Sequence, residues 1–375
     1  MYWQHEYLRE GATMTRSQTY RIDLPKSGQL SGILLKVTAP SVSAAFASGG
    51  DWRLLDYLGL VEVIGNGATV IKSLQAKNLH FTAWLHQGIV TPHFWRNYAT
   101  NTQFEYILIL FGRYLFDTDY GLDLGKWDNV ELRVTNTATA STHGSDPTVS
   151  IVQYFLRQNP GSFRGYLRSE IWREWTTVTD ETKYFVLPTE FPISGIYLRA
   201  LPAATTGMSD TGMSNLMDDV DFSIQGGTLQ LFKGGIDDLI VSNYLDRGAE
   251  IITSGEWYGT ADKGIDVSVG RMFGWAGVWG AKGGAAATVD LTMIADATDN
   301  TISFEGAQAD EVAEFITRGL AFHNTGFLLH NHLLVPDFLI DPKRDGECRL
   351  NIHTANSATA DAGTNQVILE RVVSG

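Results

Sequence analysis

The chain repeats one sequence pattern in its two halves. The motif Glu-x2-Arg-Glu at residues 6–10 returns at 170–174, and Leu-Pro-x5-Ser-Gly-Ile-x-Leu occurs at 24–35 and again at 187–198. Self-similarity over this length indicates two copies of one domain arranged in tandem. The duplication therefore sets the domain plan before any secondary structure is assigned. It also suggests that the two copies serve as equivalent building blocks.

Later landmarks follow in the same order in both halves. Residues 72–88 resemble 233–248, residues 101–104 resemble 324–327, residues 130–134 resemble 348–352, and the apolar stretch 149–156 resembles 366–373. The offset grows by about sixty residues between Gly248 and Asn324, so the second copy carries an insertion. We therefore expect domains at 1–165 and 166–375, with a small extra β-structure at about 249–306 that is rich in Gly and aromatic residues.

Short segments rich in β-branched and aromatic residues dominate each copy, and turn residues such as Gly65-Asn66-Gly67 separate them. In the first copy the predicted strands lie at 30–37, 58–64, 69–74, 79–85, 104–111, 130–135 and 149–156. About eight strands in a domain of this size predict an all-β chain of two tandem eight-stranded jelly rolls. Short helices are expected at 92–100 and at 310–320.

The net charge of −14 argues against a surface that clamps nucleic acid, because phosphate binding relies on clustered Lys and Arg. Cys348 is the single cysteine, so the fold contains no intramolecular disulfide. The start of the sequence lacks a signal-peptide pattern, and apolar runs such as Tyr106–Phe111 are too short to cross a bilayer. We therefore expect a soluble chain made in the cytoplasm.

Histidines in the second copy form a candidate metal site. His330 and His332 lie two residues apart on a predicted strand, and His353 lies on a strand candidate nearby. A duplicated cupin uses a His-x-His of this kind, but its carboxylate and glycines are absent at the expected spacing. The corresponding residues of the first copy, Ile107 and Ile109, favour a packing face instead.

The repeated Glu-x2-Arg-Glu motif has two interpretations. Its residues are Glu6, Arg9 and Glu10 in the first copy and Glu170, Arg173 and Glu174 in the second, where Trp172 and Trp175 flank it. Paired carboxylates could hydrolyse a glycoside. Retention in both copies favours a structural ion-pair cluster at a contact between domains or subunits, with the two tryptophans as anchors. Replacing both arginines should then weaken assembly more than folding.

Two acidic groups, Asp218-Asp219-x-Asp221 and Asp341-x3-Asp345, are rich enough in oxygen to attract Ca²⁺. Neither has the spacing of an EF-hand loop, which favours solvated turns. The glycines at 274–280 do not follow a strand and open a helix, so they do not form a dinucleotide fingerprint. The sequence predicts neither catalytic residues nor a bound cofactor.

The paired Leu-Pro-x5-Ser-Gly-Ile-x-Leu strands, and the order of strands after them, resemble the double jelly-roll major capsid proteins of tailless icosahedral viruses, many of which carry an internal membrane. The resemblance implies a homotrimer of near-hexagonal outline that tiles a shell in the virion together with neighbouring capsomers and vertex proteins. It implies that 249–306 forms an outward tower or a contact at the tower's base near the trimer axis, with Trp275 and Trp279 as candidates there. The segment 1–9, anchored by Tyr2 and Trp3, would face the capsid interior or a neighbouring subunit.

Two other classes of protein stay open on the sequence alone. One is a duplicated cupin-type metalloenzyme that uses the three histidines. The other is a two-domain carbohydrate-active β-sandwich protein, a class that is commonly secreted. Metal analysis would distinguish the first alternative, and a glycan array would distinguish the second.

Overall fold

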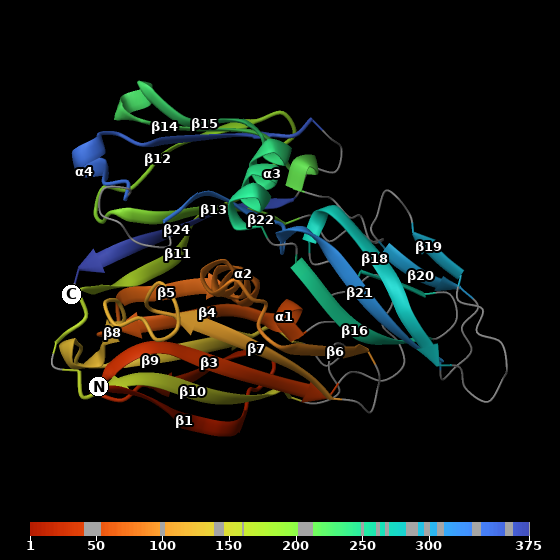
Figure 1. Cartoon of the computed structure of the whole chain (residues 1–375), viewed down its shortest axis with the longest axis horizontal. Coiled ribbons are helices and arrows are strands. Elements are labelled where there is room, and N and C mark those ends of the chain that lie inside the picture. Colours follow the sequence, from red (N-terminus) through yellow and green to blue (C-terminus); the bar gives the residue numbers. More distant parts are fainter. Residues whose placement is uncertain are drawn as a thin grey trace.

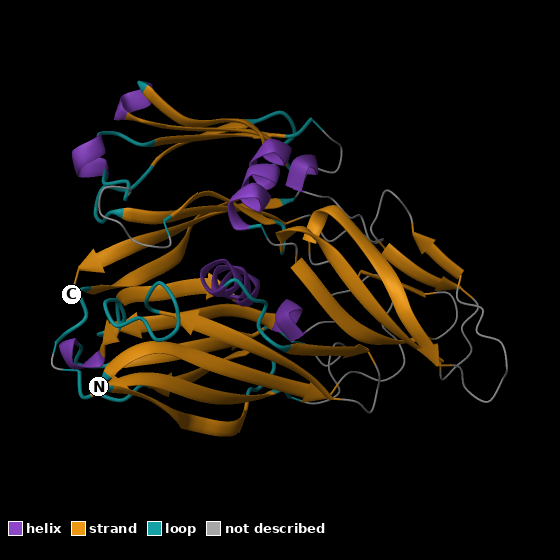
Figure 2. Ribbon diagram, in the orientation of Figure 1, coloured by secondary structure: helices purple, strands orange, loops and turns teal. Residues whose placement is uncertain are grey.

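The computed structural model describes residues 1–40, 54–97, 102–138, 146–159, 161–201, 213–248, 251–259, 263–266, 270–282, 292–295, 301–305, 311–331, 339–356 and 363–374. These residues form two stacked β-sandwiches and a set of strands that projects to one side (Figure 1). Helices are short and lie beside the sheets (Figure 2). No helix among the described residues is long and apolar enough to span a membrane.

The first sandwich consists of two four-stranded layers. One layer has the order β1 (Tyr2–Thr13), β10 (Thr148–Arg157), β3 (Gln29–Pro40) and β7 (Thr102–Leu110). The other has the order β2 (Gln18–Asp23), β9 (Val130–Asn136), β4 (Leu58–Gly65) and β5 (Thr69–Gln75). Inward-facing residues alternate along these strands, and Ile33, Ile109, Val63 and Leu132 are fully buried between the layers. Each such side chain contributes about 1.5–3 kcal/mol of burial free energy.

The second sandwich repeats this order strand for strand. One layer is β11 (Gly165–Thr176), β24 (Thr364–Ser374), β13 (Ile193–Leu201) and β22 (Thr325–His330). The facing layer is β12 (Thr182–Val186), β23 (Arg349–Thr354), β14 (Met217–Ile224) and β15 (Leu229–Gly235). A core around Ile196, Leu350 and Leu369 fills the space between them. The chain is therefore a double jelly roll, as the sequence predicted.

The segment predicted as a strand at 79–85 is instead helical. It forms α2 (Ala76–Gln87), and its counterpart in the second roll is α3 (Ile236–Arg247). Residues on every side of α2 are buried, including Leu79, Phe81 and Trp84, because the helix lies between the two rolls (Figure 1). A helix that is buried all round shows no amphipathic period, so its sequence reads equally well as a buried strand.

Both predicted helices are strands. The prediction at 92–100 falls on β6 (His93–Asn97), and the prediction at 310–320 falls on β21 (Glu311–Phe322). β21 lies between two neighbours, β16 (Ile251–Gly259) and β18 (Gly270–Lys282), and hydrogen-bonds to both along its length. Pairing on both edges outweighs the local apolar spacing that suggested a helix.

The strands of the insertion extend the first roll, although they lie within the sequence of the second. β16 pairs in parallel with β6, which pairs with β7, so the sheet runs β1-β10-β3-β7-β6-β16-β21-β18. A separate three-stranded sheet is formed by β17 (Lys263–Asp266), β20 (Thr301–Glu305) and β19 (Thr292–Ala295). The excursion thus continues to Phe322 in β21, beyond the predicted end at 306.

The remaining elements are brief. They are β8 (Leu122–Asp123), α1 (Leu54–Tyr57), α4 (Pro342–Asp345) and the 3₁₀ helices at Leu124–Lys126, Met213–Asn215 and Gln225–Gly227. Between the rolls, β11 follows β10 after the turn-rich segment 158–164.

Candidate functional site

The two rolls meet along a buried seam. β5 of the first roll pairs in parallel with β11 of the second at Lys72↔Ser169, which joins two layers into one eight-stranded sheet. Strand β24 is consequently buried on both faces. Val367 and Leu369 belong to the core of the second roll, whereas Ile368 packs with the core of the first.

Helix α2 fills the seam and touches the second roll along its length. The ring of Phe81 meets Tyr197 of β13 edge-on, with ring centroids 5.7 Å apart. Asn78 donates to Gln366 of β24 at 3.2 Å. Asn78 also accepts a 2.8 Å hydrogen bond from the buried guanidinium of Arg199. The rolls are therefore joined by specific polar pairs as well as by apolar packing.

A second polar cluster lies further along α2 and centres on Glu370 of β24. His86 Nε2 lies 3.1 and 3.2 Å from the two carboxylate oxygens, and both side chains are 2 % exposed. Ser169 and Tyr197 donate hydrogen bonds to the same carboxylate at 3.0 and 3.2 Å. Lys72 Nζ donates to Ser169 Oγ at 2.8 Å, which completes a chain from one roll to the other.

The charges of this cluster depend on one another. Burial by itself would raise the pKa of the Glu370 carboxyl, but the nearby His86 and Lys72 together lower that pKa well below its usual range. Burial lowers the pKa of the Lys72 ammonium to about 8, despite the opposing charge of Glu370. A charged carboxylate at this depth is retained because several donors surround it.

The carboxylates of the repeated motif lie on β1 and β11, the first strand of each roll. Glu6 pairs with Arg157 at 3.4 Å, and Glu170 pairs with Arg168 at 2.9 Å and with Arg371. Glu174 accepts a hydrogen bond from Gln366 Nε2. The motif's ion pairs therefore form with arginines outside the motif.

The two arginines of the motif, and Glu10, point to solvent. The guanidinium of Arg173 lies 4.6 Å above the ring of Trp172. Trp172 and Trp175 both pack against Phe185, with ring centroids 5.8 and 5.2 Å apart. These tryptophans thus join the two layers of the second roll, and the role of Arg9 and Arg173 in a subunit contact stays a prediction.

The three candidate metal histidines do not come together in the part of the chain that the structure describes. His353 lies on β23, in the layer opposite β22, where its ring nitrogens approach Asp180 and Asp218 at 3.2 and 3.8 Å. His330 lies at the end of β22, beside His86 and Tyr197. His332 lies outside the described residues.

The counterpart of His330 also differs from the one that the sequence suggested. His330 pairs with Gly195 on β13, and the corresponding Gly32 on β3 pairs with Leu110. Leu110, rather than Ile107, is therefore the equivalent residue of the first roll. The strand register therefore aligns β22 with a part of β7 three residues further along than the match of the two sequences suggests.

The acidic groups proposed for Ca²⁺ have other partners. Asp341 caps α4 by accepting from Lys343 N, and Asp345 pairs with Arg344 at 2.7 Å. Asp221 accepts a hydrogen bond from Gln230, and Asp218 lies near His353. Asp341 and Asp345 thus form a helix cap, whereas Asp218 and Asp221 lie on strand β14 rather than in the expected solvated turn.

No family model and no curated protein matches the sequence. Among solved structures, the chain is similar to that of Sulfolobus Turreted Icosahedral Virus, with a TM-score of 0.60 and 8 % identity over 99 % of this chain and 90 % of that one. The STIV MCP matches with a TM-score of 0.55 and 9 % identity, over 99 % of this chain and 97 % of that one. The PBCV-1 virus capsid matches with a TM-score of 0.52 and 11 % identity, over 99 % of this chain and 94 % of that one.

These similarities extend over the full chain, and they confirm the fold. The class of structure is the double jelly roll of viral major capsid proteins. At identities of 8–11 % the likeness concerns the fold, so the function must be argued from this chain's own surfaces.

Proposed function

We propose that this chain is the major capsid protein of an icosahedral virus, and that it assembles as a homotrimer whose six rolls form a capsomer of near-hexagonal outline. The carrying observation is that the two rolls have the same strand order and the same accessory helix. Its units would be 1–165 and 166–375. A subunit with two equivalent units supplies six similar edges from three chains.

Exposed apolar residues of α3 support a contact with another copy. The counterparts of Phe81, Trp84 and Leu85 of α2 are Val241, Tyr244 and Leu245 of α3, at the same distances from the capping glycines Gly88 and Gly248. In α2 these side chains are buried in the seam, whereas in α3 they are 40 %, 36 % and 76 % exposed. The corresponding face of α2 is buried against a roll, so the three exposed apolar residues of α3 indicate a face that a partner covers.

The outer face of the first roll is the matching surface. This face belongs to the layer β1-β10-β3-β7, which corresponds to the layer of the second roll that α2 covers. Its outward-facing residues include Tyr7, Val152 and Tyr154. Tyr7 is 62 % exposed. We infer that α3 of one copy packs on this layer of the next, just as α2 packs on β24 and β13 within the chain.

Charge complementarity specifies the register of this contact. Within the seam, Arg199 on β13 bonds to Asn78 on α2. By the repeat, their counterparts are Lys36 on β3 and Asp238 on α3, both exposed. A pair of one cation and one neutral amide inside the chain thus corresponds to an opposite-charge pair between copies, which favours association of the correct faces.

A charge exchange tests the assignment. Lys36→Asp and Asp238→Lys should each weaken the trimer roughly tenfold or more in its dissociation constant, and the double variant should recover much of the loss. Sedimentation analysis at micromolar concentration measures this. Leu245→Asp should also dissociate the trimer without lowering the unfolding temperature, because Leu245 is exposed within one chain.

Lys26 on the surface outside this face provides the matched control, since Lys26→Asp makes the same charge change elsewhere. A wild-type chain that stays monomeric, or a double variant no better than the single variants, would contradict the proposed contact. Electron microscopy of the assembled material then tests the capsid role itself, because a capsomer must tile into closed shells.

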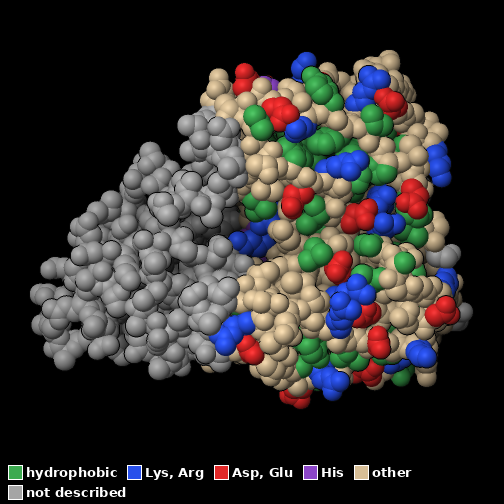
Figure 3. All heavy atoms as spheres, turned by 180° about the vertical axis from the view of Figure 1, so that it is seen from behind, with side chains coloured by type: hydrophobic (Ala, Val, Ile, Leu, Met, Phe, Trp, Pro, Cys, Tyr) green, Lys and Arg blue, Asp and Glu red, His purple; other side chains and the backbone are tan. Residues whose placement is uncertain are grey.

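The projecting strands and the surface charge fit the same role. The strands β16–β21, including Trp275 and Trp279 on β18, project to one side of the rolls, where we place the tower (Figure 1). Acidic and basic side chains are interspersed on the described part of the face seen from behind (Figure 3).

We expect neighbouring capsomers and vertex proteins as partners, and the virion as the location. An internal membrane beneath the shell is compatible with this role, and sequence-specific nucleic-acid binding is not expected.

A further inference from the structure

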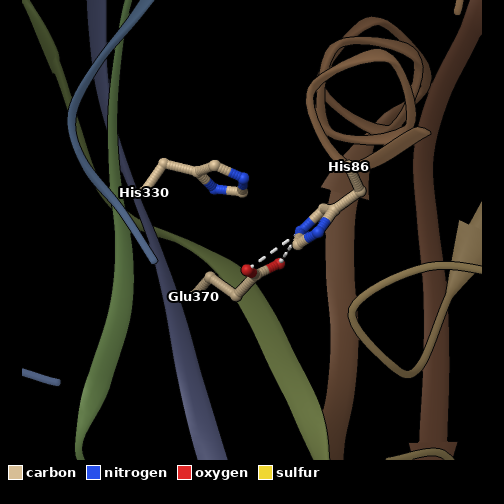
Figure 4. A group of neighbouring side chains, drawn as sticks. All are labelled: His86, His330 and Glu370. Carbon is tan, nitrogen blue, oxygen red and sulfur yellow. Dashed lines mark hydrogen bonds and ion pairs between the residues drawn. The ribbon is translucent and has the colours of Figure 1, made fainter. Parts of the chain in front are cut away.

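Three potential metal ligands converge in the seam from both rolls. His86 lies in the last turn of α2, His330 ends β22, and Glu370 lies on β24. One ligand atom from each lies within 4.8 Å of the other two. The His86 ring points toward the Glu370 carboxylate, and the His330 ring lies beside both (Figure 4). The centroids of the two imidazole rings are 4.8 Å apart.

The hydrogen bonds of His86 determine which of its nitrogens carries the lone pair. Nδ1 lies 2.8 Å from the backbone oxygen of Arg113, which can only accept, so Nδ1 carries the hydrogen. In the neutral ring Nε2 then has a lone pair, and that lone pair faces both oxygens of Glu370. The Nε2 lone pair and the two carboxylate oxygens are three acceptors that face one another and repel. A cation must therefore lie between them, either a proton or a metal ion.

Tyr197 gives His330 the same tautomer. The Tyr197 hydroxyl donates to Glu370 Oε1 at 3.2 Å and lies 3.2 Å from His330 Nδ1. Because the hydroxyl has one hydrogen, His330 Nδ1 must donate to it, which places the ring's lone pair on Nε2. An imidazole that donates through one nitrogen to a fixed oxygen is the usual outer-shell arrangement of a metal ligand.

We propose that His86, His330 and Glu370 bind a divalent transition metal ion, with Zn²⁺ the ion that the donor set fits best. Two histidines and a glutamate are an established zinc ligand set. Zinc–ligand distances of about 2.0–2.2 Å separate neighbouring ligand atoms by roughly 3.3 Å, and His86 Nε2 lies 3.1 and 3.2 Å from the carboxylate oxygens. The ion would link the first roll to the second.

The first roll shows that the fold does not require these polar residues. By strand register the counterparts of His330, Glu370 and Tyr197 are Leu110, Tyr154 and Leu34. Of the two corresponding layers, as far as the structure describes them, the one that faces α2 of the same chain carries the two ligands His330 and Glu370. This inference does not depend on the capsid role, because the site lies within one chain.

Metal binding by the full-length chain tests the proposal. After treatment with a chelator and dialysis, the protein should take up one Zn²⁺ per chain in calorimetric titration, and its unfolding temperature should rise. Glu370→Gln keeps the size of the side chain, and His330→Leu introduces the residue of the first roll. Each variant should weaken Zn²⁺ binding at least tenfold.

His353→Asn is the matched control, because His353 also lies beside carboxylates but outside the seam. It should leave the affinity unchanged. Should either seam variant fail to fold, Co²⁺ added to the wild-type chain provides a second readout, since a site with two imidazole ligands gives visible absorption bands that Zn²⁺ displaces. Substoichiometric zinc in the wild-type chain, unchanged affinity in Glu370→Gln, or loss of binding in His353→Asn would overturn the site and leave a shared proton as the cation.

Discussion

At the scale of single residues, the informative side chains are polar ones inside apolar runs. Glu370 lies within Val367-Ile-Leu-Glu-Arg-Val-Val373, which the sequence suggests is an apolar strand containing two adjacent charged residues. Its partner His86 is 284 residues away. The repeated Glu and Arg residues are more conspicuous in the sequence, because a local motif is visible there and a pairing across the seam is not.

Asp117 in the first roll makes a buried contact that controls stability in acid. Burial by itself would raise the pKa of its carboxyl, but hydrogen bonds from the Arg113 side chain and from backbone amides lower that pKa below its ordinary value. The Arg113 guanidinium donates to it at 2.7 Å through both Nε and Nη2. The carboxylate therefore stabilises the fold above the unfolded-state pKa of about 4, and this contribution is lost as the pH falls toward the folded-state value.

Asp117→Asn should lower the free energy of unfolding by about 2–3 kcal/mol near neutral pH. The difference from wild type should shrink as the pH is lowered below about 4, because the wild-type carboxyl is then protonated in the unfolded state. Urea denaturation at several pH values measures both quantities. A difference that stays constant down to pH 2 would rule out this explanation.

At the scale of elements, the two helices show how the duplication preserves backbone geometry while side chains diverge. Gly88 and Gly248 end α2 and α3 in the left-handed region, at φ of 72° and 65°, and each donates its N–H to the carbonyl four residues earlier. This repeated glycine was visible in the sequence as the end of a shared block. It marks a helix C-terminus, a signal that the strand assignment at 79–85 overlooked.

Substitution of either glycine by alanine should cost about 1–2 kcal/mol, because a Cβ disfavours the left-handed conformation. At both positions an added Cβ would meet no atom within 4 Å, so the cost should come from the backbone alone. Gly161→Ala is the control, since that site is equally open and has no left-handed φ. Thermal unfolding compares the three variants, and equal stability of all three would refute the account.

At the scale of the whole molecule, the insertion joins the two rolls in an unexpected way. β16 leaves the second roll and pairs with β6 of the first, so both rolls share the strands that project from them. Together with the continuous sheet through β5 and β11, this gives the chain two separate connections between its halves. A rigid pair of rolls suits a subunit that must present several edges at fixed angles.

The exposed arginines of the repeated motif provide a test at this scale. Arg9→Ala combined with Arg173→Ala should reduce assembly while leaving the free energy of unfolding within about 0.5 kcal/mol of wild type, since both side chains face solvent. Light scattering follows assembly, and chemical denaturation follows folding. Equal loss of both would place these residues in the stability of the rolls rather than in a subunit contact.

The sequence by itself determined the duplication, the all-β architecture and the strands β3 and β13 with their shared Ser-Gly-Ile. These features follow from local periodicity and from comparison of the chain with itself. Tertiary structure alone decided that 76–87 is a helix, that 311–322 is a strand, and that His86 meets Glu370. Each of these depends on what packs on the far side of the segment, and that neighbour comes from a distant part of the chain.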